Sequence, residues 1–237
     1  MALPKLTTPT YELEIPSTDA KIKYRPFLVK EEKILMMAME SKKNADIVQA
    51  VKDIVSECTF NKVDMSDLPM FDVEYIFLQI RSKSVGEVSK LRILCPDDGK
   101  TYADVELDLN EVKVQVGDEH TNKIELSKDM GIIMKYPTID SFRESGIQDI
   151  NATNMLDVIG ACIMQIYEEG GKKTYDPKDQ TKKELNDFME QLTTKQFKDV
   201  QSFFDTMPKL KHTIKVTNPK TKKENEIILT GLNDFFE

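Results

Sequence analysis

Residues 91–109 read LRILCPDDGKTYADVELDL: an alternating strand, a charged turn that opens with an X-Pro pair, and a second alternating strand. The same order recurs at residues 214–229, IKVTNPKTKKENEIIL, where Asn218-Pro219 begins the turn. Such units frame zinc ribbons, because thiolates beside two tight turns can close a tetrahedral site. Only Cys95 stands in the first turn, and Asn218 takes its place in the second. We therefore predict two zinc-ribbon-like knuckle hairpins that lack most metal ligands and are held by packing.

Motifs that carry known chemistry are missing from the sequence. It contains no GxxxxGK[ST], GxGxxG, GxSxG or HExxH, and no CxxC or CxxH pair. Its two histidines, His120 and His212, stand at no helical spacing from a carboxylate or a cysteine. The acidic turn at Asp97-Asp98 lacks the spacing of a calcium loop. We predict no catalytic residue, no cofactor, no bound metal and no small-molecule substrate.

The composition of the chain indicates which partners and which cellular compartment to expect. The 237 residues carry 41 acidic and 33 basic side chains, a net charge of -8, which on balance repels phosphate backbones. Nucleic acid is therefore not an expected main partner. Three widely spaced cysteines suit a reducing compartment, and we expect Cys58 and Cys162 in the core. The start lacks the pattern of a secretory signal, and no segment approaches the roughly 20 apolar residues of a membrane helix.

Residues 1–28 are expected to form an extended N-terminal arm, because prolines deny ladder hydrogen bonds and fix φ. The prolines are Pro4, Pro9, Pro16 and Pro26. Within the arm, Tyr11–Ile15 reads as a strand that pairs with Lys21–Arg25 across a short turn. Two roles stay open for the arm: reaching to a neighbouring molecule, or forming an edge hairpin of its own fold.

Residues 29–86 form a predicted helical segment. Apolar spacings of three and four residues indicate helices from Lys30 to Ser41 and from Asn44 to Cys58. Asp67-Leu68-Pro69 reads as a cap with proline in the first turn of a third helix of about 14 residues. In the first of these helices Ile34, Leu35, Met37 and Ala38 mark the face that we expect to be buried.

Residues 87–137 are predicted to form a small antiparallel sheet with the first knuckle hairpin. Further strands are expected at Val112–Val116, Lys123–Leu126 and Ile132–Tyr136. Acidic residues alternate with apolar ones in this segment, so one face of the sheet should meet water.

Residues 138–208 form a second predicted helical segment, and residues 209–237 the second knuckle hairpin with a C-terminal anchor. We expect helices at Thr138–Glu144, Asn154–Glu168, Thr181–Leu192 (opened by a capping box) and Thr194 to Pro208. Asn154–Glu168 is apolar over most of its circumference, which favours the centre of the fold over burial by a partner chain. The order of helices, sheet, helices and hairpin indicates an α+β fold.

Two features point to contacts with other molecules. Chain ends usually fray and are polar, so Leu232, Phe235 and Phe236 should be anchored, either on their own domain or in a neighbouring subunit. Lysines also gather around the second knuckle turn, between Lys209 and Lys223. A basic tip of this kind would bind an acidic partner or a nucleic acid, although a solvated turn is its commoner role.

Three passages carry a resemblance to a known family: Ala2-Leu3-Pro4-Lys5, YRPFLVKEEK at residues 24–33, and GLNDFF at residues 231–236. They resemble the baseplate hub proteins of T-even-type contractile-tail bacteriophages, over nearly the full length, and the arm is particularly similar to cyanophage-like members. The resemblance implies a role in building the central hub of the tail baseplate, as a virion subunit or as an assembly factor. It implies no catalytic residues. Some members of the family look as though they carry cysteines in the knuckles, whereas this sequence keeps only Cys95.

We therefore predict a structural or assembly component of the baseplate hub, which binds other hub proteins, is assembled in the host cytoplasm and resides in the virion tail. The predicted contact residues are Leu3, Tyr11, Leu13, Pro96, Pro219, Leu232, Phe235 and Phe236. One alternative is a nucleic-acid-binding module built on a degenerate zinc ribbon, marked by a basic face at residues 209–223. Another is an enzyme whose carboxylates come from distant segments.

Overall fold

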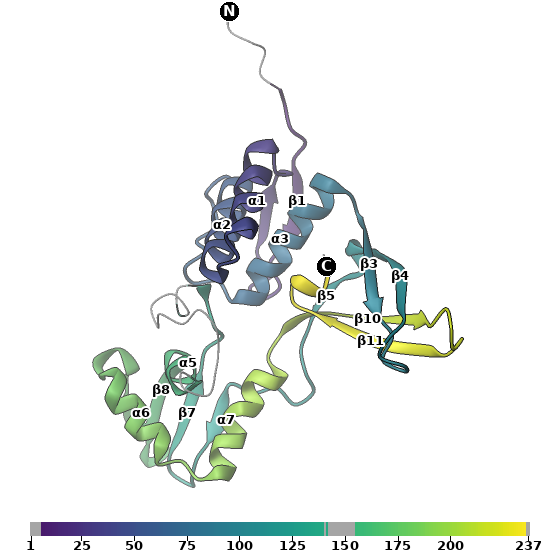
Figure 1. Ribbon diagram of the computed structural model, residues 1–237. Helices are drawn as coiled ribbons and strands as arrows, with labels where there is room; N and C mark the ends of the chain where they lie inside the picture. Colours follow the sequence, from purple (N-terminus) through teal and green to yellow (C-terminus); the bar gives the residue numbers. More distant parts are fainter. Residues whose placement is uncertain (1–5, 140, 142–154, 236–237) are drawn as a thin grey trace, which may run out of the picture. The chain divides into compact units, whose positions relative to one another are not determined.

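The computed structural model describes residues 6–139, 141 and 155–235 (Figure 1). The chain folds into two compact units. Unit 1 comprises Met1–Met65, Phe71–Gln115 and Lys209–Glu237, and unit 2 comprises Ser66–Met70 and Val116–Pro208. Helices and small antiparallel sheets occur in both units, which confirms the predicted α+β class.

Unit 1 begins with a hairpin of β1 (Tyr11–Glu14) and β2 (Lys21–Tyr24). These two strands were predicted to pair, at nearly the same bounds. The amide of Ser17 in the turn donates to Asp72 Oδ1 at 3.1 Å, on helix α3 (Met70–Val85). The described part of the N-terminal arm is thus a hairpin attached to its own unit.

Helices α1 (Val29–Ser41) and α2 (Asn44–Cys58) follow, close to their predicted bounds. A buried ion pair connects them to the preceding strand. Arg25 Nη2 lies 2.9 Å from Glu31 Oε1, and the Arg25 amide donates to the carbonyl of Cys58. Glu31 Oε2 also accepts from the Leu28 amide at 2.7 Å, which caps α1. Burial alone would raise the pKa of Glu31, but the hydrogen bonds from Arg25, Leu28 and Lys30 outweigh it and lower that pKa.

The two predicted knuckle hairpins are both present in unit 1. β3 (Val88–Leu94) pairs with β4 (Tyr102–Asp108), and β10 (Lys209–Thr217) pairs with β11 (Glu224–Thr230). β10 also pairs antiparallel with β5 (Lys113–Gln115), so the order of this sheet is β11-β10-β5. Short 3₁₀ turns at Leu109–Glu111 and Asn233–Phe235 complete this part of the unit.

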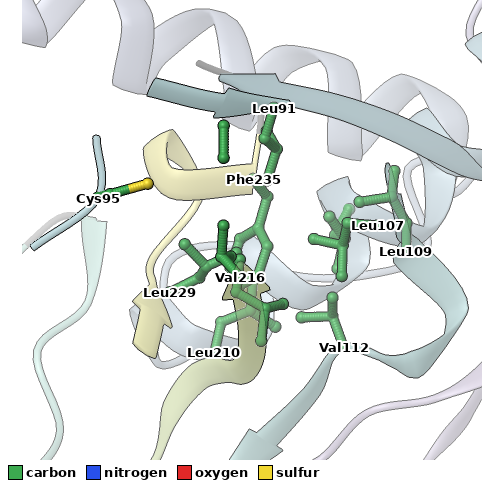
Figure 2. Packing of buried hydrophobic residues seen from close by; sticks show 12 residues of the cluster. Leu91, Cys95, Leu107, Leu109, Val112, Leu210, Val216, Leu229 and Phe235 are labelled. Carbon is green, nitrogen blue, oxygen red and sulfur yellow. The ribbon is translucent and has the colours of Figure 1, made fainter. Parts of the chain in front are cut away.

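The core of unit 1 joins segments that lie far apart in the sequence. Side chains from both hairpins and the C-terminal 3₁₀ turn converge in it, as Figure 2 shows. Leu78 of α3 belongs to the same core. Its buried members include Leu78, Leu91, Leu107, Leu109, Val112, Leu210, Val216, Leu229 and Phe235. Packing of the two hairpins therefore depends on the last residues of the chain.

Unit 2 contains a four-stranded antiparallel sheet in the order β6-β7-β8-β9. The strands are β6 (Lys123–Glu125), β7 (Gly131–Met134), β8 (Ile163–Glu168) and β9 (Lys173–Tyr175). Its helices are α5 (Met155–Ala161), α6 (Lys182–Glu190) and α7 (Thr194–Thr206), with 3₁₀ turns at Glu169–Gly171 and Pro177–Asp179. Gly131 is required in β7, because an added Cβ would lie 2.5 Å from the backbone carbonyl oxygen of Ile124 and would also clash with the Tyr167 hydroxyl.

The prediction of one helix from Asn154 to Glu168 is wrong. Helix α5 ends at Ala161, and residues 163–168 form β8, which pairs with β7 through Ile132 and Ile166. A short apolar run does not distinguish a buried helix from a buried strand, and here residues 163–168 form a strand that pairs with β7.

The capping box of Thr181 and Glu184 at the start of α6 is confirmed. The helix expected at Thr138–Glu144 lies largely outside the described residues.

The single sheet predicted for residues 87–137 is also wrong. Its strands are divided among three sheets: β3 with β4, β5 with β10 and β11, and β6 and β7 with β8 and β9. An alternating pattern predicts a strand but not the strand with which it pairs, and several of the pairing strands here come later in the chain.

Cys58 and Cys162 are buried as expected, and burial raises their pKa to about 11 and about 12.

Replacement of Glu31 by Gln tests the buried ion pair. The substitution removes the nearer counter-charge of the buried Arg25 guanidinium and leaves it only the exposed Glu57 carboxylate at 4.0 Å, so we expect the free energy of unfolding to fall by about 3 kcal/mol. Denaturant titration followed by circular dichroism measures this change. Glu32→Gln, at an exposed position of the same helix turn, is the control and should cost less than about 1 kcal/mol. Equal denaturation midpoints for the two variants would contradict the assigned role of the pair.

Candidate functional site

The two knuckle turns share one hydrogen bond and one left-handed residue. In the first, the Gly99 amide donates to the Cys95 carbonyl at 3.0 Å; in the second, the Lys222 amide donates to the Asn218 carbonyl at 2.9 Å. The residue that donates has a left-handed φ in both turns, 62° at Gly99 and 61° at Lys222. Residues 95–99 and 218–222 correspond in these two respects, although the first turn is closed by the bond from the Cys95 amide to Thr101 and the second, one residue shorter, by the bond from the Asn218 amide to Lys223.

One carboxylate joins the two turns. Asp97 Oδ1 accepts from Asn218 Nδ2 at 2.8 Å and from Asn225 Nδ2 at 3.1 Å, and Asp97 Oδ2 accepts from the Thr221 hydroxyl. We call this set of hydrogen bonds the Asp97 clasp. The bonds from Thr221 and Asn218 lower the pKa of Asp97, so it stays ionised.

Asn218 is the buried centre of the second turn. Its side chain is fully buried, and its Oδ1 accepts from the amides of Lys220 at 2.8 Å and Thr221 at 3.2 Å. Because its Nδ2 donates to Asp97, both ends of the amide have partners. A side chain with this pattern shapes its own turn and fixes it to the other.

Asp98 closes the first turn. Its Oδ1 accepts from the amides of Lys100 and Thr101, each at 3.0 Å, and its Oδ2 accepts from the Thr101 hydroxyl at 2.6 Å. These bonds, with that from the Thr101 hydroxyl foremost, hold the pKa of Asp98 well below its usual range. The carboxylate is thus engaged by its own turn.

Cys95 is fully buried, and burial raises the pKa of its thiol. A protonated, buried thiol is a poor metal ligand and a poor nucleophile. Within residues 6–139, 141 and 155–235, no three or more His, Cys, Asp or Glu side chains are grouped to hold a metal ion. The described knuckle turns are joined by polar side chains of the Asp97 clasp.

The predicted contact residues fall into distinct environments. Pro96 and Pro219 are exposed, and the clasp brings their turns together. Tyr11 and Leu13 are half-buried in β1, where the Tyr11 ring packs 5.6 Å from the Tyr24 ring. The Lys83 ammonium lies 5.7 Å from the Tyr11 ring centre.

The C-terminal residues are anchored within unit 1. Phe235 is fully buried in the core, and its carbonyl accepts from the Ser89 hydroxyl at 2.8 Å. Leu232 is half-buried against the same core. Of the two alternatives for Phe235, the structure shows anchoring on its own domain, so its side chain is not a surface contact. Leu3 and Phe236 lie outside the described residues.

The histidines have structural partners. His120 Nδ1 lies 2.9 Å from the Thr206 hydroxyl and Nε2 lies 3.0 Å from the Tyr136 hydroxyl, while the ring packs on Phe203. Burial lowers the pKa of His120, which favours its neutral form. His212 is half-buried within β10 and pairs with Leu229. The contacts of His120 connect the loop before β6 to α7, and His212 takes part in the pairing of β10 with β11.

A hollow of about 220 Å³ in unit 2 is mostly apolar. It is lined by Met130, Ile166, Glu168, Tyr175, Gln180, Glu184, Leu185 and Phe188. Its carboxylates are engaged: Glu168 accepts from the Tyr175 hydroxyl, and Glu184 accepts from Thr181 in the capping box. It is smaller than typical ligand pockets of about 300–1,000 Å³. The hollow therefore offers no paired acid and base.

Helix α1 exposes apolar side chains that the sequence analysis did not assign to the surface. Met36, Met37 and Met39 are 58%, 61% and 56% exposed, and Ile34 is 43% exposed. The expectation that Ile34 and Met37 are buried is wrong, whereas Ala38 is buried as expected. The signal available in the sequence was the run of methionines, which often marks adaptable contact surfaces.

These features define a protein that offers shaped surfaces on two small folded units. Residues 8–237 match the family described as T4 bacteriophage base plate protein. The chain therefore belongs to this family of phage baseplate proteins, and its place is the tail baseplate of the virion. Neither the curated proteins nor the solved structures gave a match. Among the described helices, none has the length and apolar character needed to cross a membrane.

Replacement of Asn218 by Ala tests the clasp. The variant leaves two turn amides and the Asp97 carboxylate without this partner, so we expect the free energy of unfolding to fall by about 1–3 kcal/mol. Denaturant titration measures the loss. Asn110→Ala, at an exposed position with local hydrogen bonds, should change stability by less than about 1 kcal/mol. A midpoint for Asn218→Ala equal to that of the unaltered protein would show that the clasp contributes nothing.

Proposed function

We propose that this baseplate protein is a structural or assembly component of the central hub, and that it acts by binding other hub proteins. The observation that carries the proposal is the family match over residues 8–237. The structure adds support, since the Asp97 clasp holds two exposed turns together. Polar side chains that fix the shape of an exposed surface are consistent with a function in binding another protein.

The proposed contacts lie at three places in unit 1. The first is the pair of knuckle turns with the exposed Pro96 and Pro219, whose fixed φ limits the turn conformations. The second is the N-terminal hairpin with Tyr11 and Leu13, together with Leu3 before it. The third is the C-terminal turn with Leu232, together with Phe236 after it. In zinc ribbons a metal connects turns like these, whereas in this chain the Asp97 clasp connects them.

A nucleic-acid-binding role finds no support in these observations. The chain carries 41 acidic against 33 basic side chains, and its net charge of -8 opposes association with phosphate backbones. An enzymatic role would need free ionisable groups that converge, and the ionisable side chains of the hollow in unit 2 are engaged: Glu168 accepts from the Tyr175 hydroxyl, and Glu184 accepts from Thr181.

Mass spectrometry of purified baseplates and their hub intermediates tests the proposal. We expect this chain at a fixed ratio to the other hub proteins, either in the finished baseplate or in intermediates alone. A variant that lacks residues 1–10 keeps β1 and the core, so it should fold but be incorporated less efficiently. Circular dichroism of the purified variant controls for folding. Absence of the full-length chain from baseplates and from every hub intermediate would refute the proposed function.

A further inference from the structure

We propose that the paired knuckle turns carry a docking site for an acidic surface of another baseplate protein. This inference rests on the proposed function and assigns a partner chemistry to one of its surfaces. The site consists of four lysines, which we call the basic tip: Lys100 on the first turn, and Lys220, Lys222 and Lys223 on the second. All four side chains are exposed.

The ammonium groups of the basic tip form no ion pair with other side chains in the part of the chain that the structure describes. The carboxylates of the same turns have other hydrogen-bond partners: Asp97 accepts from Asn218, Asn225 and Thr221, and Asp98 accepts from its own turn. Both carboxylates keep their negative charge, so the two turns carry four lysines against two aspartates and are positive on balance. The lysines are therefore exposed to a second molecule on a protein that is otherwise acidic.

Lys222 occupies a backbone conformation that favours glycine. Its φ is 61°, and its counterpart in the first turn is Gly99, with a φ of 62°. A side chain makes this left-handed conformation unfavourable, whereas glycine adopts it freely. The bond from the Lys222 amide to the Asn218 carbonyl needs only a backbone N–H, which glycine also has. The turn itself thus does not require lysine, and what lysine adds at this position is its cation.

The Asp97 clasp presents the lysines together. It joins residues 121 positions apart in the sequence and so connects Lys100 to the three lysines of the second turn. Pro96 and Pro219 restrict each turn at its second position. A pre-organised charged surface loses less conformational entropy on binding than a flexible one.

An acidic protein surface fits the basic tip better than nucleic acid does. Four lysines complement a local cluster of carboxylates and would steer its approach over short distances. A duplex extends past any single turn, so it would also meet the remaining surface, which carries the excess of acidic residues. We therefore assign the acidic protein surface as the occupant.

Charge reversal tests this assignment. The tip variant replaces Lys220, Lys222 and Lys223 by Glu. The control variant replaces Lys183, Lys195 and Lys198, which are exposed in unit 2, and changes the net charge equally. Each is supplied to infected cells whose phage lacks a functional copy of the gene, and its amount in baseplates and hub intermediates is measured against the sheath protein. We expect incorporation to fall by at least about tenfold for the tip variant and by less than about twofold for the control.

A second variant, Lys222→Gly, separates the docking role from a role in folding. Glycine relieves the left-handed backbone, so the thermal midpoint should not fall, while incorporation should fall by about twofold or more because one cation is lost. Unchanged incorporation of both the tip variant and Lys222→Gly would overturn the docking site. It would leave the proposed function intact, which fails only if the unaltered chain is absent from baseplates and intermediates.

A DNA-binding experiment tests nucleic acid as the alternative partner of the basic tip. Fluorescence anisotropy with a short DNA duplex at physiological salt should show no binding that depends on the tip. Binding that the unaltered protein shows and the tip variant loses, together with normal incorporation of that variant, would assign the lysines to nucleic acid and overturn the inference.

Discussion

Closure of one apolar core by the end of the chain is the constraint on which unit 1 depends. Phe235 packs against residues from α3, β3, β4 and β10, and the members of this cluster extend from Leu78 to Phe235. Full burial of a large apolar side chain contributes about 1.5–3 kcal/mol. Without the last segment, the two knuckle hairpins would lose the packing that brings them together, and the Asp97 clasp would have no partner turn. The polar surface feature therefore follows from the apolar core beneath it.

The Asp97 clasp gives the proposed docking surface a defined shape. Polar side chains usually hold a turn by bonding to its own backbone, as Asp98 does. Asp97 instead accepts hydrogen bonds from side chains of the other hairpin, which holds the two knuckle turns together as one surface. Rigid presentation of charge lowers the entropy lost on docking, which suits a protein that has to be placed once within a large assembly. Because the chain belongs to the baseplate family, the large assembly in question is the phage tail baseplate.

Local patterns predicted the elements of this fold well where all the required information lay in one contiguous stretch. Both knuckle hairpins could be predicted because strand, turn and strand follow one another, and the α6 start because Thr181 and Glu184 are three residues apart. Predictions failed where a distant partner decides the outcome. Residues 163–168 are a strand only because β7 lies beside them, and β5 belongs with β10 rather than with the strands near it in sequence.

The candidate site was only partly predictable for the same reason. Pro96 and Pro219 could be singled out from the turn pattern, but the bonds of Asp97 to Asn218, Thr221 and Asn225 cross more than a hundred residues and leave no local signal. Phe235 is a large apolar residue near a chain end, and sequence alone does not say whether its own core or a neighbour buries it. Ile34 and Met37 of α1 were predicted to be buried because their spacing fits a buried face, yet both are exposed.

Hydrogen exchange of the free protein tests most directly whether the knuckle surface is formed before any partner binds. The amides of Gly99 and Lys222 donate inside the two turns, and their exchange reports on turn opening. The account predicts that both exchange at least about 100-fold more slowly than in an unstructured peptide, and that both lose protection in Asn218→Ala. Exchange of both amides at the unstructured rate in the free protein would contradict it, because the surface would then form only on docking.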